Sequence, residues 1–225
     1  LKYINNKSRV FDNLKTSFCD KEILNPLGVA AGFDKNAEVI NGCFKLGFGF
    51  VEVGTVTPMP QVGNLKPRVF KIPEYESIIQ RLGFNNLGVE NLINNLQQTK
   101  VADSGVIGVN IGRNKNSSDY IDDYVNLYKI VSDYSDYVTI NISSPNTPGL
   151  RDMQNKEQFE RLITKLSMIK KKRKTFIKLS PEISDKNLKN ICKISMNEEF
   201  ITGLILTNTT IKREMLFKKP VKDSW

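Results

Sequence analysis

Short apolar runs rich in β-branched residues alternate along this chain with longer stretches of amphipathic, helical periodicity. Such runs indicate buried strands, and such stretches indicate helices that pack on them. The predicted strands are Ile23–Gly32, Phe50–Thr57, Val106–Gly112, Val138–Ser143, Thr175–Ser180 and Ile201–Thr209. The predicted helices are Asn36–Leu46, Val89–Thr99, Ser118–Tyr134, Lys156–Lys171 and about Asp185–Met196. Near the start, Leu14–Phe18 and Glu22–Leu24 flank a tight turn and predict a hairpin. The part rich in Pro and Gly between Thr57 and Val89 is expected to be irregular.

The alternation of strands and helices defines the fold class. Nearly continuous apolar strands indicate a parallel sheet covered by helices. A doubly wound open sheet and a (β/α)₈ barrel both fit this rhythm. No G-x-G-x-x-G sequence opens the first helix, which disfavours a dinucleotide-binding fold. We therefore expect an α/β protein of the (β/α)₈ TIM-barrel type. Residues 1–225 would form one domain with about six of the eight β/α units and an N-terminal hairpin.

Polar side chains stand at the carboxyl end of almost every predicted strand. They are Lys35, Thr55, Asn110, Asn141, Lys178 and Thr207–Thr209. An amide or ammonium group buried on a strand costs several kcal/mol unless a partner satisfies it. Taken singly, Lys178 could extend to water past the strand, and each Asn could cap a loop. Together they favour the barrel, whose active sites collect side chains from many strand ends.

The loop after the fourth predicted strand is the most informative of these strand ends. Val138–Ile142 reads as a buried strand, and two prolines and a glycine then end it abruptly within Ser143–Gly149. Hydroxyl and amide groups are thereby held at the carboxyl end of a strand, where α/β proteins bind ligands. The alternative is an ordinary turn whose Ser and Asn side chains bond to their own backbone.

The composition narrows the chemistry. The chain of 225 residues has no histidine, which excludes Ser-His and Cys-His pairs and histidine metal sites. Its three cysteines lack metal-ligand spacing, so we expect reduced cysteines and no metal site. The small residues Ala30–Gly32 would let a flat ring approach the backbone. Together with neutral amides and two lysines, they indicate a flat redox cofactor and a small anion rich in amide groups.

The net charge of +9 adds little to this picture. The basic run Lys170–Lys174 lies where a helix is predicted to end, so its cations complement the helix dipole. No interleaved aromatic residues or nucleic-acid motif accompany it, and we expect no nucleic-acid partner. No apolar run is long enough to cross a membrane.

Seven segments, in order from about Asn25 to Thr210, resemble one known family. They are NPLGVAAGFDKN (Asn25–Asn36), FVEVGTVTP, GNLKPRVF (Gly63–Phe70), RLGFNNLG, GVNIGRNK (Gly108–Lys115), INISSPNTPGLR and LTNTT. They look like the corresponding segments of class 2 dihydroorotate dehydrogenases, which are membrane-associated and quinone-dependent. Seven motifs in one order are far more specific than any single motif.

The resemblance implies an FMN-containing (β/α)₈ barrel. Such an enzyme oxidises dihydroorotate to orotate in pyrimidine (UMP) biosynthesis and passes the electrons to a ubiquinone-type quinone. It implies peripheral attachment to the bacterial or mitochondrial inner membrane through segments absent from this chain. The chain begins at Leu1 without the amphipathic helix pair of that class, and it ends at Trp225 after six predicted strands. We therefore expect a partial sequence of a longer enzyme.

The resemblance also assigns site residues. Those implied to line or contact FMN are Ala31, Gly32, Phe33, Asp34, Lys35, Thr55, Asn110, Asn141, Lys178 and Thr207. Those implied to hold the substrate are Lys35, Gln80, Arg81, Leu82, Gly83, Phe84, Asn141, Asn146, Asn208 and Thr209. The chain differs from the family at position 80, where it has Gln and the family usually has Asn.

Ser144 matches the family's catalytic base. Class 1 enzymes carry cysteine at this position, so the serine indicates class 2. A serine hydroxyl is a poor base alone, and it can accept a proton only if neighbouring groups such as Lys35 stabilise the charge that develops. Two rival readings are another FMN-dependent barrel oxidoreductase, of class 1 or dihydropyrimidine type, and an inactive fragment. Ser144 and the GFDKN sequence argue against the first.

Overall fold

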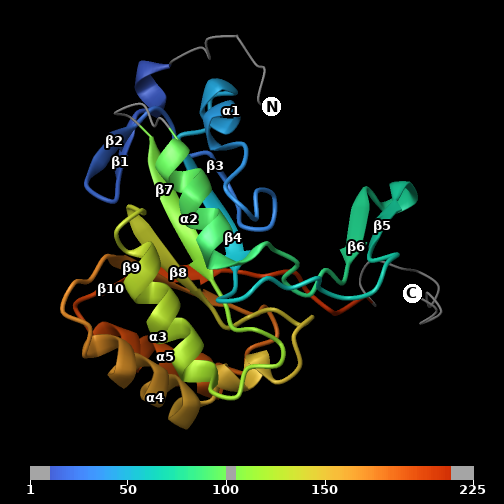
Figure 1. Cartoon of the computed structure of the whole chain (residues 1–225), viewed down its shortest axis with the longest axis vertical. Helices are drawn as coiled ribbons and strands as arrows, with labels where there is room; N and C mark the ends of the chain where they lie inside the picture. The colour runs from blue at the N-terminus through green and yellow to red at the C-terminus, as the bar shows by residue number, and fades with distance from the viewer. Residues whose placement is uncertain (1–10, 100–104, 214–225) are drawn as a thin grey trace.

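The computed structural model describes residues 11–99 and 105–213 (Figure 1). Its main sheet has six parallel strands in the order β10-β9-β8-β7-β4-β3. In chain order they are β3 Gly28–Val29, β4 Phe50–Val56, β7 Val106–Ile111, β8 Tyr137–Asn141, β9 Lys174–Leu179 and β10 Ile201–Leu206. The sheet curls into a half-barrel, which confirms the expected partial (β/α)₈ architecture.

Five α-helices connect and cover these strands within the described residues. They are α1 Ile40–Lys45, α2 Gly88–Gln98, α3 Tyr120–Val131, α4 Lys156–Ser167 and α5 Asp185–Met196. Side chains cap the N-termini of α3 and α5. The Asp119 carboxylate accepts from the N–H groups of Ile121 and Asp122, and the Ser184 hydroxyl accepts from Asn187 N–H. Both residues are preferred N-caps because they satisfy N–H groups that the helix leaves unpaired.

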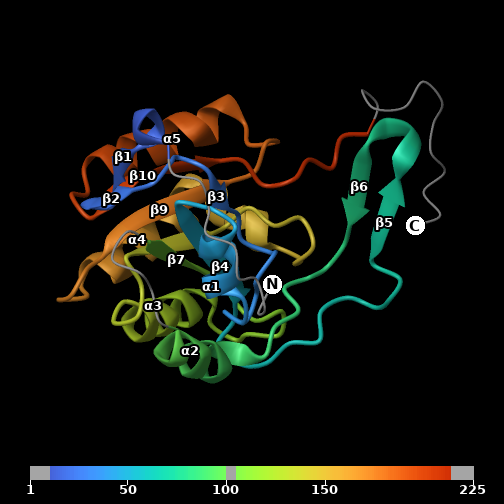
Figure 2. The ribbon, with the colours of Figure 1, turned by 90° about the horizontal axis from the view of Figure 1, so that it is seen from above.

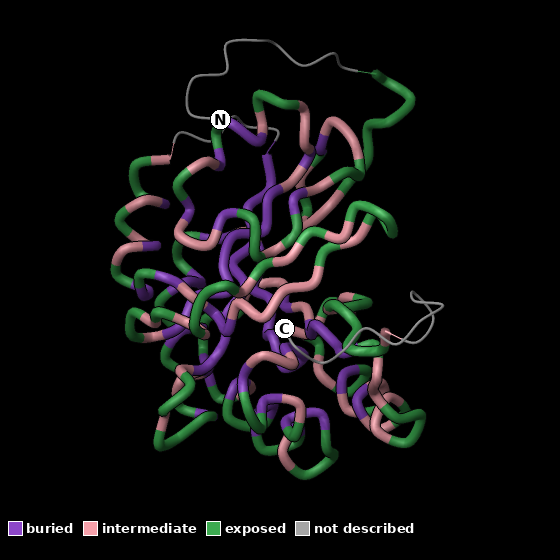
Figure 3. The backbone as a smooth tube through the Cα atoms, turned by 90° about the vertical axis from the view of Figure 1, so that its right-hand side faces the viewer, coloured by how far each residue is buried: buried purple, intermediate pink, exposed green. Residues whose placement is uncertain are grey.

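The hydrophobic core lies between the helices and the outer face of the sheet. Every residue of β7 and β8 is buried, as expected for parallel strands covered on both faces. Leucines and aromatic residues on one side of each helix complete this layer, for example Leu92, Leu127 and Phe159. Burial is concentrated along the strands, and the outer helix turns are exposed (Figure 3).

A separate aromatic cluster fills the half-barrel at the amino ends of the strands. Phe18, Phe50, Tyr137 and Phe176 belong to it, and the ring centroids of Phe18 and Phe50 lie 5.0 Å apart. Tyr137 meets Phe176 edge-on at 5.2 Å, an arrangement that aromatic pairs prefer. Phe18 comes from the predicted N-terminal hairpin, which is confirmed as β1 Thr16–Phe18 and β2 Lys21–Ile23. The hairpin therefore helps to close the amino end of the half-barrel.

The first predicted strand and helix are both too long. Only Gly28–Val29 of the expected Ile23–Gly32 pairs with the sheet, because Pro26 has no N–H and the Asn25 side chain accepts from Leu27 N–H in a turn. The helix begins at Ile40 and not at Asn36. The Asp34 carboxylate accepts from the N–H groups of residues 38 and 39 and holds the preceding residues in a turn.

The part expected to be irregular contains an antiparallel hairpin. Its strands are β5 Val69–Ile72 and β6 Ser77–Gln80, joined by the 3₁₀ turn Pro73–Tyr75. The hairpin projects from the body of the molecule, and the segment after β10 runs out to meet it (Figure 2). Further 3₁₀ helices are Asp12–Leu14 and Leu150–Gln154. The β-branched and aromatic residues of Val69–Ile72 were the signal that the Pro and Gly content obscured.

Candidate active site

A recess lies at the carboxyl ends of the central strands, and we call it the strand-end recess. Its lining residues are Ala31, Gly32, Lys35, Thr55, Gln80, Leu82, Gly83, Phe84, Asn141, Ser144, Asn146, Lys178 and Asn208. All of them were predicted from the sequence as site residues. They come from the ends of β4, β8 and β9, from the end of β6, and from the loops after β3, β6, β8 and β10. The topology therefore brings segments far apart in the sequence to one place.

Lys35 contributes an ammonium group held by an amide. Its Nζ donates to Asn85 Oδ1 at 2.8 Å. Burial, and secondarily the charge of Arg68, lowers the pKa of Lys35 to about 8. Both causes act because a partly buried cation near a second cation is less stable than a neutral amine. An anionic ligand in the recess would offset this cost and favour the charged form.

Lys178 is a second cation in the recess. It lies on β9 beside Asn141 of β8 in the parallel register and is 9% exposed. Within the part of the chain that the structure describes, its ammonium group makes no hydrogen bond or ion pair. The nitrogen atom itself keeps contact with the open recess, and a ligand that filled the recess without offering this charge a partner would be disfavoured. Lys178 is therefore suited to an electron-rich or anionic ligand atom.

Ser144 stands on the loop that follows β8, 6% exposed. Its Oγ accepts from the Asn146 N–H at 3.3 Å, a bond between neighbours that orients the hydroxyl. The loop is anchored by Arg151, whose Nε donates to the carbonyl of Ser143 at 3.1 Å. Arg151 in turn forms an ion pair with Glu182 at 3.0 Å. The hydroxyl is thus held in the recess by a loop tied to the chain beyond β9.

Three buried polar side chains connect the strands beneath the recess. Thr55 Oγ1 donates to Asn110 Oδ1 at 2.6 Å, and Asn141 Nδ2 donates to the same oxygen at 3.1 Å. Asn141 Nδ2 also donates to Thr55 Oγ1 at 2.9 Å. Asn110 is fully buried and does not line the recess itself. These contacts fix the polar ends of β4, β7 and β8 relative to one another.

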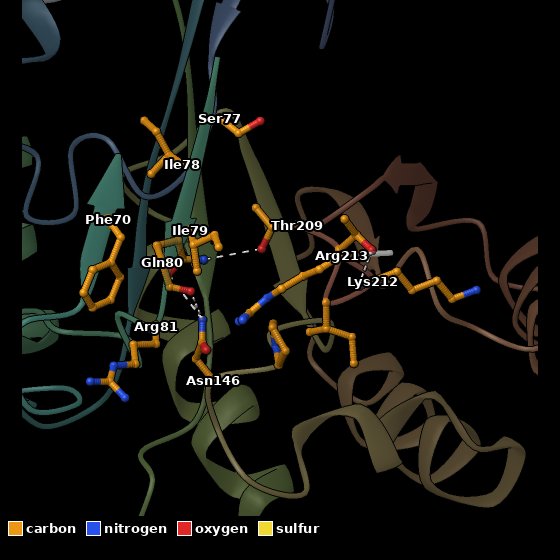
Figure 4. Close-up of a pocket in the computed structure, with 13 residues that line it drawn as sticks. Phe70, Ser77, Ile78, Ile79, Gln80, Arg81, Asn146, Thr209, Lys212 and Arg213 are labelled. Atoms are coloured by element: carbon orange, nitrogen blue, oxygen red, sulfur yellow. Dashed lines mark hydrogen bonds between the residues drawn. The ribbon is translucent and has the colours of Figure 1, made fainter. Parts of the chain in front are cut away.

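Five predicted site residues lie elsewhere or face away. Phe33 is 64% exposed and Asp34 bonds to the backbone of residues 38 and 39. Arg81 donates to the carbonyl of Pro67, and the Thr207 hydroxyl donates to the carbonyl of the next residue. Arg81 and Thr209 line a larger neighbouring cavity of about 350 Å³, between β6 and the segment after β10 (Figure 4).

Two residues near the recess were missed or misread from the sequence. Asn85 holds Lys35, and its position one residue beyond the predicted Gln80–Phe84 segment was the available signal. Glu52 is not among the predicted site residues. It lies in the interior of the half-barrel, where among the described residues it accepts hydrogen bonds from Asn110, Tyr137 and Thr139.

The residues of the recess fit a flat heteroaromatic ring. A Cβ added at Gly32, whose φ is +104°, would meet no heavy atom within 4 Å, so the backbone there borders open space. Ala31 adds only a methyl group, and Lys178 offers an ammonium group beside the neutral amide of Asn141. The described residues contain no group of three or more side chains that could hold a metal ion. The fold and the recess thus define an α/β half-barrel protein with a polar recess, lined by two lysines, at the carboxyl ends of its strands.

Comparisons with known proteins agree with this class. The family model for dihydroorotate dehydrogenase matches residues 13–224. A protein of Bartonella henselae named dihydroorotate dehydrogenase (quinone) is 44% identical over 222 residues, which are 95% of this chain and 60% of that protein. A protein of the same name from Pseudoalteromonas translucida is 42% identical over 91% of this chain and 63% of its own length.

Solved structures lead to the same family. A crystal structure of DHODH from Eimeria tenella in complex with ferulenol superposes with a TM-score of 0.86 at 35% identity. The match covers 94% of this chain and 64% of that one. The chain belongs to the dihydroorotate dehydrogenase family, and it spans about three fifths of the length of the curated relatives it matches. None of the helices in residues 11–99 and 105–213 has the length and apolarity needed to cross a membrane.

Proposed function

We propose that this chain carries the dihydroorotate-oxidising site of a quinone-dependent dihydroorotate dehydrogenase, with FMN as its cofactor. The observation that supports this most directly is the content of the strand-end recess. A serine hydroxyl, two lysine ammonium groups and several amides line it together. The match to proteins named dihydroorotate dehydrogenase (quinone) supports the same activity.

The floor of the recess is the proposed FMN site. Ala31, Gly32, Thr55 and Lys178 would hold the ring, with Asn110 and Asn141 supporting it from the strands below. When bound, FMN supplies an acceptor for the two electrons and the hydrogen removed from the substrate. Lys178 would place its positive charge beside electron-rich atoms of the ring, which offsets the cost of burying it without a protein partner.

The substrate would lie between the ring and the loop after β8. Dihydroorotate has one carboxylate and two carbonyl groups, so it needs donors and positive charge. Lys35, Asn146 and Asn208 offer them in the recess, and Gln80–Phe84 would close over the substrate. Arg81 and Thr209 would act from the neighbouring cavity. The side chains of Lys35, Gln80, Arg81, Asn146, Asn208 and Thr209 each carry a hydrogen-bond donor.

Ser144 is the proposed base. Its Oγ would accept the proton that leaves the substrate ring as the double bond of orotate forms. The Asn146 N–H that donates to Oγ stabilises negative charge developing there. The ammonium group of Lys35 in the same recess acts in the same sense, provided that it is protonated.

The reaction would serve pyrimidine biosynthesis, with a quinone as the final acceptor at the face of a membrane. An anaerobic titration of the purified, FMN-loaded protein tests this proposal. One equivalent of dihydroorotate should bleach one equivalent of flavin absorbance and yield one orotate, and a ubiquinone analogue should restore the colour. Bleaching with NADH or dihydrouracil but not with dihydroorotate would instead identify another flavin oxidoreductase, and protein that retains no FMN would contradict the proposal.

A further inference from the structure

Glu52 is a buried carboxylate to which the proposed reaction assigns no role. It lies on β4 and is 4% exposed. Its two oxygens accept from Asn110 Nδ2 at 2.8 Å, Thr139 Oγ1 at 2.9 Å and Tyr137 OH at 3.1 Å. No lysine or arginine among the described residues forms an ion pair with it. Burial, followed by the charge of Glu52, raises the pKa of Tyr137 well above its usual value, so Tyr137 remains a donor.

A carboxylate can only accept hydrogen bonds, so Glu52 decides which way Asn110 faces. The Asn110 amide must present its NH₂ group to Glu52 and therefore its oxygen to the other side. That oxygen accepts from Thr55 Oγ1 and from Asn141 Nδ2. If Asn110 turned over, its oxygen would meet the carboxylate oxygen of Glu52, which is repulsive.

The hydrogen bonds from Asn141 to the loop after β10 have the same donor-to-acceptor direction. Because Asn141 donates to Asn110, its own oxygen faces away and accepts from Ser143 Oγ at 2.8 Å. Ser143 Oγ in turn accepts from Asn208 Nδ2 at 3.0 Å. The Asn208 oxygen accepts from the Thr209 hydroxyl at 3.3 Å. Each donor therefore points toward the Glu52 end.

The chain of contacts continues across the recess to the hairpin. Gln80 Nε2 donates to Thr209 Oγ1 at 3.4 Å, and Gln80 Oε1 accepts from Asn146 Nδ2 at 3.3 Å (Figure 4). Asn146 is also the residue whose N–H donates to Ser144 Oγ. The side-chain contacts thus run in one direction from Asn146 to Glu52, and the backbone N–H of Asn146 links their starting point to the proposed base.

Backbone N–H groups fix three of these amides independently. Asn141 Oδ1 accepts from Ser143 N–H at 3.2 Å, and Asn208 Oδ1 accepts from Thr209 N–H at 2.7 Å. Gln80 Oε1 accepts from the N–H of Leu82 at 3.0 Å. A backbone N–H can only donate, so each amide oxygen is assigned by a group that cannot change its role. All three assignments agree with the direction that Glu52 imposes.

We infer that Glu52 is a positioning residue that sets the orientation of Asn110 and, together with the backbone N–H groups described above, the direction of the side-chain contacts that lead to the proposed dihydroorotate site, an inference that rests on the proposed function. With this orientation, Asn208 and Gln80, which line the recess, each keep a second N–H that no contact within the described residues uses. Free donors suit a ligand with a carboxylate and ring carbonyls. Without the carboxylate, Asn110 can turn over and point its NH₂ group at the NH₂ group of Asn141, which removes a contact that aligns Asn141 in the recess. Hydrogen bonds aligned in one direction also strengthen one another.

Two substitutions at Glu52 distinguish the effect of its hydrogen-bond acceptors from the effect of its side-chain size. Glu52→Met keeps the length of the side chain and removes the acceptor. Glu52→Gln keeps an acceptor oxygen for Asn110, because its NH₂ group can donate to the hydroxyls of Tyr137 and Thr139. Tyr137→Phe is the matched control, since it removes a hydrogen bond to Glu52 and leaves the contact with Asn110 intact.

The measurements use the FMN-loaded protein. They are the Kd of orotate from the change in flavin absorbance, the Kd of FMN, and KM and kcat for dihydroorotate. We expect Glu52→Met to raise the orotate Kd and the KM by about tenfold or more, the cost of one misdirected buried amide. Glu52→Gln and Tyr137→Phe should stay within about threefold of the unmodified protein. Ser143→Ala breaks the chain at an unrelated point, and it should also raise the orotate Kd by about tenfold.

An orotate Kd for Glu52→Met that equals that of Tyr137→Phe would overturn the inference. So would a Glu52→Gln protein as impaired as Glu52→Met. If Glu52→Met does not fold, unchanged orotate binding by Ser143→Ala overturns it. These outcomes are distinct from failure of the proposed function, in which the unmodified protein would bind no FMN or leave dihydroorotate unoxidised.

Discussion

The two ends of the same strands have opposite characters. At the amino ends of β4, β8 and β9, the half-barrel interior holds the rings of Phe50, Tyr137 and Phe176. Toward the carboxyl ends, those strands carry Thr55, Asn141 and Lys178. The first set gains free energy by leaving water, and the second set loses free energy unless each group finds a partner. One end therefore stabilises the fold, and the other holds the proposed chemistry.

Two lysines of the strand-end recess illustrate this contrast between the ends of the strands. Lys178 is buried with no partner among the described residues, and burial lowers the pKa of Lys35. Neither arrangement stabilises the protein without a ligand. Functional sites often retain such unfavourable groups, at a cost in stability. Substitutions at the two ends should therefore change stability and function independently.

The largest effect on stability is expected at the amino end. Phe176→Ala removes a ring packed against Phe18 and Tyr137 and should lower the free energy of unfolding by about 3 kcal/mol. Urea denaturation measures this loss. In protein that remains folded, the KM for dihydroorotate should stay within about threefold of its original value. A large change in KM without a loss of stability would contradict the division between the two ends.

At the carboxyl end, we expect a substitution to weaken ligand binding without lowering the free energy of unfolding. Lys178→Met removes a buried charge, so the free energy of unfolding of the FMN-free protein should stay the same or rise by about 1 kcal/mol. The affinity for FMN should fall by about tenfold to a hundredfold, because a charge-assisted contact is lost. Fluorescence titration with FMN and urea denaturation measure the two quantities. Lys170→Met in the exposed basic run is the control, and it should change neither. A variant with both lower stability and full FMN affinity would contradict this assignment.

A smaller and pH-dependent effect is expected from Lys35. Its pKa is lowered to about 8, so its positive charge is lost as the pH rises through that value. Orotate binding should weaken above pH 8, by up to about tenfold per pH unit. Lys35→Arg should remove this dependence, since arginine keeps its charge. The same decline in Lys35→Arg would assign the titration to another group.

The same pKa predicts the pH dependence of stability without ligand. Between about pH 8 and the ordinary lysine pKa of 10.5, the unfolded chain binds more protons at Lys35 than the folded chain does. The free energy of unfolding should therefore rise with pH through this window, relative to Lys35→Met. Urea denaturation at pH 7.5 and pH 10 measures the difference.

The sequence predicts most of the strands and helices because burial dominates them. β4, β7, β8 and β9 lie within one or two residues of their expected bounds, and α5 matches them. The first strand and helix were too long because Asn25 and Asp34 bond to nearby backbone N–H groups. Such local competition leaves no mark in the apolar pattern. The hairpin β5–β6 was missed because its two strands are only four residues long and prolines and glycines lie close to them.

The site was predictable to the extent that it follows strand ends. Lys178 and Asn141 were predicted as site residues because a polar residue on a buried, apolar strand costs free energy unless a partner or ligand satisfies it. Glu52 and Asn85 were not, because their partners are 58 and 50 residues away in the sequence. The direction in which each amide faces depends on those distant contacts. It becomes visible only when the strands are placed side by side.

The central claim is that the carboxyl end of the strands holds a site in which Ser144 is the base. Ser144→Ala leaves every side chain of the proposed FMN site in place and removes only the hydroxyl. The most direct measurement is the rate at which dihydroorotate bleaches the bound flavin under anaerobic conditions, together with the FMN content of the purified variant. The account predicts unchanged FMN content and a rate lower by about a hundredfold to ten-thousandfold. Bleaching at close to the original rate would contradict it.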